Sequence, residues 1–151
     1  VASLIGVRQV TRFEGQTAMA LEFAIDSALG EGAWYRFGLT DGDGGALAAD
    51  WEPTVRAILD DVQKKTPVSQ IAIRFHNGLV ELIVEVARRT RQRRVALGGG
   101  CFQNRYLLQH TIRRLREEGY QPYWPQRVPP GDGSIALGQA IAIGRGQDSE
   151  G

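Results

Sequence analysis

Three short segments of the sequence combine residue types that suit the binding of a phosphate, a nucleotide or a metal ion. In the segment 98–104, three glycines are followed by Cys-Phe-Gln-Asn, ending at Asn104. Glycines allow a backbone to approach a ligand closely, and free N–H groups at the start of a helix attract anions. We therefore expect Gly99 and Gly100 to lie near a phosphate. A tight strand-to-helix turn without a ligand would have the same pattern.

The segment 129–139 places Asp132 directly before a predicted helix of small residues. An aspartate in this position can cap the helix that follows it. Alternatively, its carboxylate can face a cleft and hold a metal ion together with ligands from elsewhere in the protein. The spacing by itself leaves both roles open.

A third polar group precedes the first predicted helix, where Glu14 and Gly15 lie in the stretch Phe-Glu-Gly-Gln-Thr and Glu22 follows two turns later. A loop glycine with polar neighbours at a helix start suits a ribose or a phosphate. The remaining candidates are Cys101, His76 and His110. We interpret Cys101 as a small buried residue rather than a nucleophile, because neither histidine lies near it in the sequence, and both histidines as structural.

The composition limits the class of protein further. A chain of 151 residues is long enough for one ordinary domain with its own core. The net charge of +1 favours neither a nucleic-acid partner nor a membrane surface, and the apolar stretches are shorter than the roughly 18 residues of a membrane span. The single cysteine excludes an internal disulfide and fits a reducing compartment, so we expect a cytoplasmic protein.

The apolar spacing and the turn residues predict the elements of the first half. We expect a helix over 14–29, a hairpin with strands at 34–39 and 46–49, and a short helix that begins at 51–53. A calcium loop at Asp41 and Asp43 would need a glutamate at its twelfth position, which is absent. We therefore interpret this run as the hairpin turn.

A longer helix is predicted to begin at Thr66-Pro67 and to end in the basic cluster 88–94. Such a cluster could bind a phosphate or nucleic acid, but we favour the interpretation that its charges complement the helix dipole. A strand at 94–97, a helix at 102–118, a strand at 121–124 and a helix at 134–143 follow. This order predicts an α/β domain with a mixed sheet and flanking helices. The long helix carries a continuous apolar stripe made of Val68, Ile71, Ala72, Phe75, Leu79, Leu82, Ile83 and Val86.

Taken together, four stretches resemble the HypF family of hydrogenase-maturation carbamoyltransferases. They are Phe-Glu-Gly-Gln at 13–16, Arg-Phe-His-Asn at 74–77, and the segments 98–104 and 129–139, in the order in which the family has them. With the opening residues 1–6, the resemblance spans nearly the whole chain. It implies the second half of an actin/sugar-kinase-like ATPase-type domain, which the family shares with tRNA threonylcarbamoyl-transferring enzymes.

The resemblance also implies a function. Proteins of this family take a carbamoyl group from carbamoyl phosphate and activate it with ATP as carbamoyl-adenylate. They pass it to the C-terminal cysteine of a partner maturation protein, where it becomes the cyanide ligand of nickel–iron hydrogenases. The match places Gly99, Gly100 and Asn104 against the nucleotide, Glu14 and Gly15 on the ribose side, and Asp132 as a ligand of a divalent metal ion.

The sequence departs from the family pattern in one respect. The family's domain takes further metal ligands from a paired-histidine motif, and no His-x-x-x-His pair is present here. We therefore expect residues 1–151 to be the C-terminal portion of the domain, inactive alone and completed by chain upstream of Val1. The alternatives are a small-molecule O-carbamoyltransferase of the same fold and a non-catalytic domain that binds a nucleotide or a partner protein.

Overall fold

The structure is a computed structural model that describes residues 1–26 and 32–147. The chain order is α1 (Gln16–Phe23), β1 (Gly38–Asp41), the 3-10 helix η2 (Asp43–Gly45), β2 (Leu47–Asp50), α2 (Glu52–Gln63), α3 (Val68–Thr90), β3 (Arg94–Ala96), η3 (Gly100–Gln103), α4 (Arg105–Glu117), β4 (Gln121–Tyr123), η4 (Asp132–Ser134) and α5 (Ile135–Gln147). The α/β class with flanking helices is confirmed. The described strands form two separate two-stranded sheets rather than one mixed sheet: β1–β2 is antiparallel and β3–β4 is parallel.

Residues 1–5 form a single helical turn that Gly6 ends at a φ of +76°. After this turn, the first half of the chain differs from the prediction in one helix and one strand. The helix predicted over 14–29 begins after Gly15 and ends at Phe23, so 24–26 are not helical, and 27–29 lie outside the described residues. The strand predicted over 34–39 begins only at Gly38, because the residues before it run along α3 instead of pairing with β2.

Residues 34–37, the Tyr35 segment, are tied by Tyr35 to α3 and to the end of α2. Its N–H donates to the Arg74 carbonyl oxygen at 3.2 Å, and its hydroxyl donates to the Asp61 carboxylate at 2.5 Å. Arg74 also donates to Asp61, at 2.7 Å. Burial and the Asp61 hydrogen bond raise the pKa of Tyr35. Burial alone would raise the pKa of Asp61, but the hydrogen bonds from Tyr35 and Arg74 outweigh it and hold that pKa below its ordinary value.

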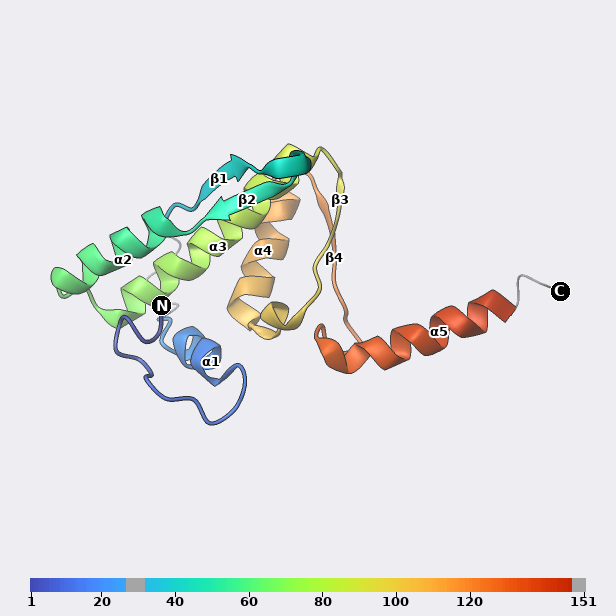
Figure 1. Cartoon of the computed structure of the whole chain (residues 1–151), viewed down its shortest axis with the longest axis horizontal. Helices are drawn as coiled ribbons and strands as arrows, with labels where there is room; N and C mark the ends of the chain where they lie inside the picture. The colour runs from blue at the N-terminus through green and yellow to red at the C-terminus, as the bar shows by residue number, and fades with distance from the viewer. Residues whose placement is uncertain (27–31, 148–151) are drawn as a thin grey trace.

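α3 is the central helix and lies between α2 and α4 (Figure 1). It joins two hydrophobic cores. Its first half packs with α1, α2 and the Tyr35 segment, and its second half packs with α4 and the strand region around β3. The buried members of the first core are Ala2, Ile5, Leu21, Tyr35, Ile58, Ile71 and Ala72, and those of the second are Val84, Ala87, Leu97 and Leu115. The two cores therefore fix α1 and α4 relative to the same helix.

The predicted stripe on α3 is confirmed as buried only at Ile71 and Ala72. Val68 is exposed. The stripe residues from Phe75 to Val86 are half-buried, whereas Val80 and Val84 are buried. The reason is that α3 is covered on more than one side, by the Tyr35 segment and by α4, so its buried face is not a single stripe.

α5 stands apart from the rest of the fold. Figure 1 shows it projecting away from α3 and α4, and every side chain from 135 to 143 is exposed. The predicted helix over 134–143 is confirmed, yet residues 135–143 of α5 contribute to neither core. In the part of the chain that the structure describes, no helix combines the length and apolarity that a membrane crossing would need.

Candidate functional site

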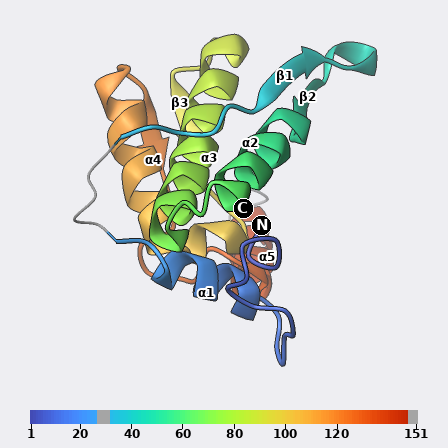
Figure 2. The same cartoon turned by 90° about the vertical axis from the view of Figure 1, so that its left-hand side faces the viewer.

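A cavity of about 470 Å³ opens between α1, α3 and the segment that leads from η3 into α4. Figure 2 shows α1 lying across the ends of α3 and α4 at this place. The volume is in the range of roughly 300–1,000 Å³ that small-molecule sites occupy. Four of the six predicted site residues line the cavity, namely Glu14, Gly15, Gly100 and Asn104. The fold thus brings the segment that carries Glu14 and Gly15 together with the glycine-rich segment 98–104.

The glycine loop lies directly beside the turn that carries Asp132. The N–H of Gly99 donates to the Pro130 carbonyl oxygen at 2.7 Å. A Cβ added at Gly131 would lie 3.5 Å from the Gly100 Cα, so the two turns are in close contact. Gly99 itself, which is not among the lining residues, has a φ of +97°, a conformation that L side chains rarely adopt. The structure therefore brings two of the predicted segments into contact at this edge of the cavity.

The beginning of η3 presents backbone N–H groups near the cavity. Gly100 and Cys101 are the first residues of this 3-10 helix, whose initial N–H groups have no acceptor within it. Both residues line the cavity. The expectation that Cys101 is buried is wrong, because its side chain is exposed. The neighbouring Phe102 packs against the second core instead.

The N-terminus of α4 is already occupied by protein groups. Oε1 of Glu22, from α1, accepts hydrogen bonds from the N–H groups of Arg105 at 2.7 Å and Tyr106 at 3.2 Å. Oδ1 of Asn104 accepts from the Leu107 N–H at 2.8 Å and caps the helix. The expectation of free N–H groups at this helix start is therefore wrong for α4, where the anion present is the Glu22 carboxylate. No local sequence signal links Glu22 to residues more than eighty positions away.

His76 is buried in α3 behind the cavity wall, with 3% of its surface exposed. Its Nδ1 lies 2.8 Å from the Ala72 carbonyl oxygen, which can only accept, so Nδ1 carries the proton. Its Nε2 then accepts a hydrogen bond from Nδ2 of Asn104 at 2.9 Å. Burial lowers the pKa of His76, against the opposing effects of the Ala72 hydrogen bond and of Glu22. The predicted structural role of His76 thus has a specific partner, Asn104, which sequence reasoning missed.

Asp132 is the first residue of η4 and its side chain is exposed. No side-chain hydrogen bond caps η4, so the capping role is not seen at this turn. Among the residues that the structure describes, no group of three or more histidine, cysteine, aspartate or glutamate side chains could hold a metal ion. Asp132 is therefore at most one ligand of a site whose other ligands lie elsewhere.

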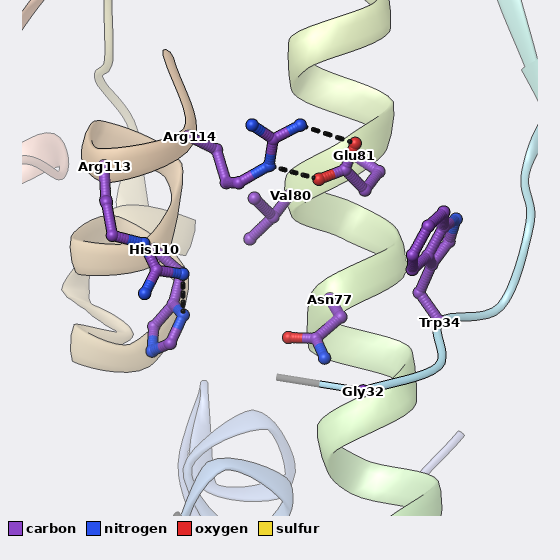
Figure 3. Close-up of a pocket in the computed structure, with 8 residues that line it drawn as sticks. All are labelled: Gly32, Trp34, Asn77, Val80, Glu81, His110, Arg113 and Arg114. Carbon is purple, nitrogen blue, oxygen red and sulfur yellow. Dashed lines mark hydrogen bonds and ion pairs between the residues drawn. The ribbon is translucent and has the colours of Figure 1, made fainter. Parts of the chain in front are cut away.

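A second, smaller hollow of about 170 Å³ lies between α3 and α4 (Figure 3). Figure 3 shows Trp34 beside α3, with Arg113 and Arg114 on the facing helix. The Arg114 guanidinium makes a two-point ion pair with Glu81, at 2.7 and 3.2 Å, and its pKa is raised mainly by this contact. Arg113 donates to Nδ1 of His110 at 3.2 Å. Because its cations bond to protein groups, this hollow is the weaker candidate.

Comparison with known proteins identifies the family of the chain. Residues 1–139 match the family described as the second subdomain of the Kae1-like domain of carbamoyltransferases, and the chain belongs to this family. Carbamoyltransferase HypF of Synechocystis is 45% identical over 142 residues, which cover 94% of this chain and 18% of that protein. Carbamoyltransferase HypF of Rhizobium leguminosarum is 36% identical over 144 residues, covering 91% of this chain and 18% of that protein.

The solved structures support the same assignment. A crystal structure of full-length HypF in the phosphate- and nucleotide-bound form matches with a TM-score of 0.82 at 36% identity, over 95% of this chain and 19% of that one. HypF of T. kodakarensis matches with a TM-score of 0.71 at 24% identity, over 98% of this chain and 19% of that one, which shows the shared fold alone. The predicted fold is confirmed, and the chain spans less than a fifth of the length of these relatives.

Proposed function

We propose that this chain contributes one wall of the nucleotide site of a carbamoyltransferase. In this function a carbamoyl group from carbamoyl phosphate is activated with ATP as carbamoyl-adenylate. It is then transferred to the C-terminal cysteine of a partner maturation protein for cyanide-ligand synthesis in nickel–iron hydrogenases. The observation that carries the proposal is the cavity in which Glu14, Gly15, Gly100 and Asn104 converge. A nucleotide as the ligand class is supported by HypF, a relative of this chain whose structure was solved in a phosphate- and nucleotide-bound form.

In this proposal the glycine loop binds the charged part of the nucleotide. The N–H groups at the start of η3 offer hydrogen bonds to an anion, and Gly100 leaves room for close approach because a Cβ there would meet no atom within 4 Å. Glu14 and Gly15 lie exposed on the opposite side of the cavity and contact the ribose. Asn104 keeps one amide N–H beyond its two bonds to Leu107 and His76, and this group donates to the nucleotide.

The site is completed by other parts of the protein. A divalent metal ion would have Asp132 as one ligand from this chain, and three or more protein ligands are needed for useful affinity. α5 exposes the large apolar side chains Ile135, Leu137, Ile141 and Ile143, which is the kind of surface that packs against another part of a protein. We expect the 151-residue chain alone to show no carbamoyl transfer.

The function is tested by adding a side chain to the cavity at Gly100. Gly100 does not have a positive φ, so Gly100→Val is compatible with the backbone, whereas valine at Gly99 would strain it. In the full-length protein, Gly100→Val is expected to abolish ATP-dependent carbamoyl transfer with an unchanged melting temperature. Gly98→Val is the control, because Gly98 is equally open but does not line the cavity. Carbamoyl transfer by Gly100→Val at the wild-type rate contradicts the proposal. If the wild-type protein binds the nucleotide but transfers no carbamoyl group, the chain belongs to a non-catalytic binding domain.

The role of Asp132 is tested separately in the full-length protein. As an exposed residue without a capping hydrogen bond, Asp132 contributes little to stability. Asp132→Ala is expected to lower both the metal content and the rate of carbamoyl transfer while the melting temperature stays the same. If the metal content is unchanged and stability falls by about 1 kcal/mol, Asp132 is a helix cap and not a metal ligand.

A further inference from the structure

The hydrogen bonds of His76 fix the orientation of the Asn104 side chain. Because Nδ1 of His76 donates to the Ala72 carbonyl oxygen, Nε2 can only accept, and Nδ2 of Asn104 is the donor. The Asn104 amide therefore cannot be turned over, and its Oδ1 is directed to the Leu107 N–H at the start of α4. The last free N–H of the amide is thereby held in one direction at the cavity wall.

We propose that neutral His76 is a positioning residue that orients Asn104 for the nucleotide in the cavity. This inference rests on the function proposed above and adds to it a residue that does not touch the ligand itself. His76 is buried, so it acts through Asn104. Removing the acceptor at Nε2 leaves the Asn104 amide held by its bond to Leu107 alone, and the nucleotide then has to complete its ordering on binding.

A proton on His76 would have the same effect. A protonated Nε2 is a donor, and it would face the donor Nδ2 of Asn104. The amide would have to turn over, which would also place an N–H group against the Leu107 N–H and remove the cap of α4. Protonation of His76, orientation of Asn104 and the start of α4 are therefore coupled.

The groups around His76 determine the pH range of this effect. Glu22 from α1 favours the proton, whereas burial and His110 from α4 oppose it. The rings of Phe75 and Tyr106 pack edge-on against His76 at centroid distances of 5.7 Å and exclude water. Burial, as the largest effect, sets the pKa of His76 below its ordinary value of 6.5. The neutral form of His76 therefore predominates at pH 6.5 and above, and nucleotide affinity is expected to fall at lower pH.

The test measures the Kd of a non-hydrolysable ATP analogue for the full-length protein between pH 5 and pH 8. His76→Leu removes the acceptor and is expected to weaken binding about three- to tenfold at pH 7.5, the equivalent of one oriented hydrogen bond. His76→Gln places an amide oxygen near the position of Nε2 and does not titrate. It is expected to restore wild-type affinity at pH 7.5 and to abolish the wild-type loss below pH 6.5.

His110→Gln is the matched control, because His110 is the other histidine of residues 1–151. It should retain the loss of affinity at acid pH. Unchanged affinity of folded His76→Leu, or disappearance of the acid loss in His110→Gln rather than in His76→Gln, overturns the role of His76. A wild type that does not bind the analogue at pH 7.5 refutes the proposed function itself.

Nitrogen-15 NMR of the histidine rings gives a readout that does not depend on the nucleotide. At pH 7.5 the proposal requires a protonated Nδ1 and an unprotonated Nε2 on His76. A proton on Nε2 at this pH overturns the positioning role, whether or not the protein binds the analogue.

Discussion

Gly78→Ala is a sharp test of how the Tyr35 segment packs on α3. Gly78 lies in the middle of α3, and a methyl group there would overlap the Tyr35 carbonyl oxygen. In an exposed helix, replacing glycine by alanine stabilises the folded state by about 1 kcal/mol. Here the new methyl group would meet a backbone atom. The overlap can therefore be relieved only by moving the Tyr35 segment, which weakens the hydrogen bond between Tyr35 and Arg74.

The expected magnitude follows from these opposing effects. Overpacking of a well-filled site costs about 3 kcal/mol at the upper end of the usual range, and the gain in helix propensity offsets about 1 kcal/mol of it. We therefore expect Gly78→Ala to lower the free energy of unfolding by about 2 kcal/mol. With a denaturant slope of about 2 kcal/mol per molar, the urea midpoint would fall by about 1 M.

The assay is urea unfolding of the 151-residue chain, followed by circular dichroism and by tryptophan fluorescence, since Trp34 lies in the segment that must move. Gly138→Ala is the matched control, because Gly138 is also helical but an added Cβ there would meet no atom within 4 Å. It should leave the midpoint unchanged or raise it. An equal increase in stability for both variants would refute the close packing of Tyr35 on Gly78.

Two further predictions concern ion pairs. The pKa of Asp61 lies below its ordinary value of 3.8, so ionised Asp61 stabilises the fold above pH 3.8, and this stabilisation is lost as the pH falls further. In urea titrations, Asp61→Asn should therefore be less stable than the wild type at pH 7 and should lack this loss of stability in acid. Arg114→Ala should lower the free energy of unfolding by about 1 kcal/mol through loss of its two-point pair with Glu81, which is about a quarter exposed on each side. Arg56→Ala, in a far more exposed pair, is the control and should have almost no effect. Equal losses for the two arginine variants would contradict the structural role of the Arg114 pair.

Much of the local structure could be predicted because it depends on neighbours in the sequence. The helices after Thr66 and before Gly119 follow from apolar spacing and end signals, and Gly119 has the positive φ expected of a residue that closes a helix. The helix predicted over 102–118 begins only at Arg105, because Asn104 caps α4 and the residues before it form η3. Family motifs in the sequence also indicated which segments meet at the cavity, and four of their residues line it.

The tertiary structure alone decided which polar groups meet. Glu22 reaches the N-terminus of α4, and His76 bonds to Asn104, although these partners are far apart in the chain and no local pattern couples them. The Tyr35 segment leaves the sheet for α3 because a buried hydrogen-bonded contact there outweighs its strand propensity. The sequence by itself thus determined most of the helices, the hairpin and four of the residues that line the cavity. The long-range contacts decided which backbone N–H groups are occupied and how Asn104 is oriented, since such contacts depend on the packing of whole elements.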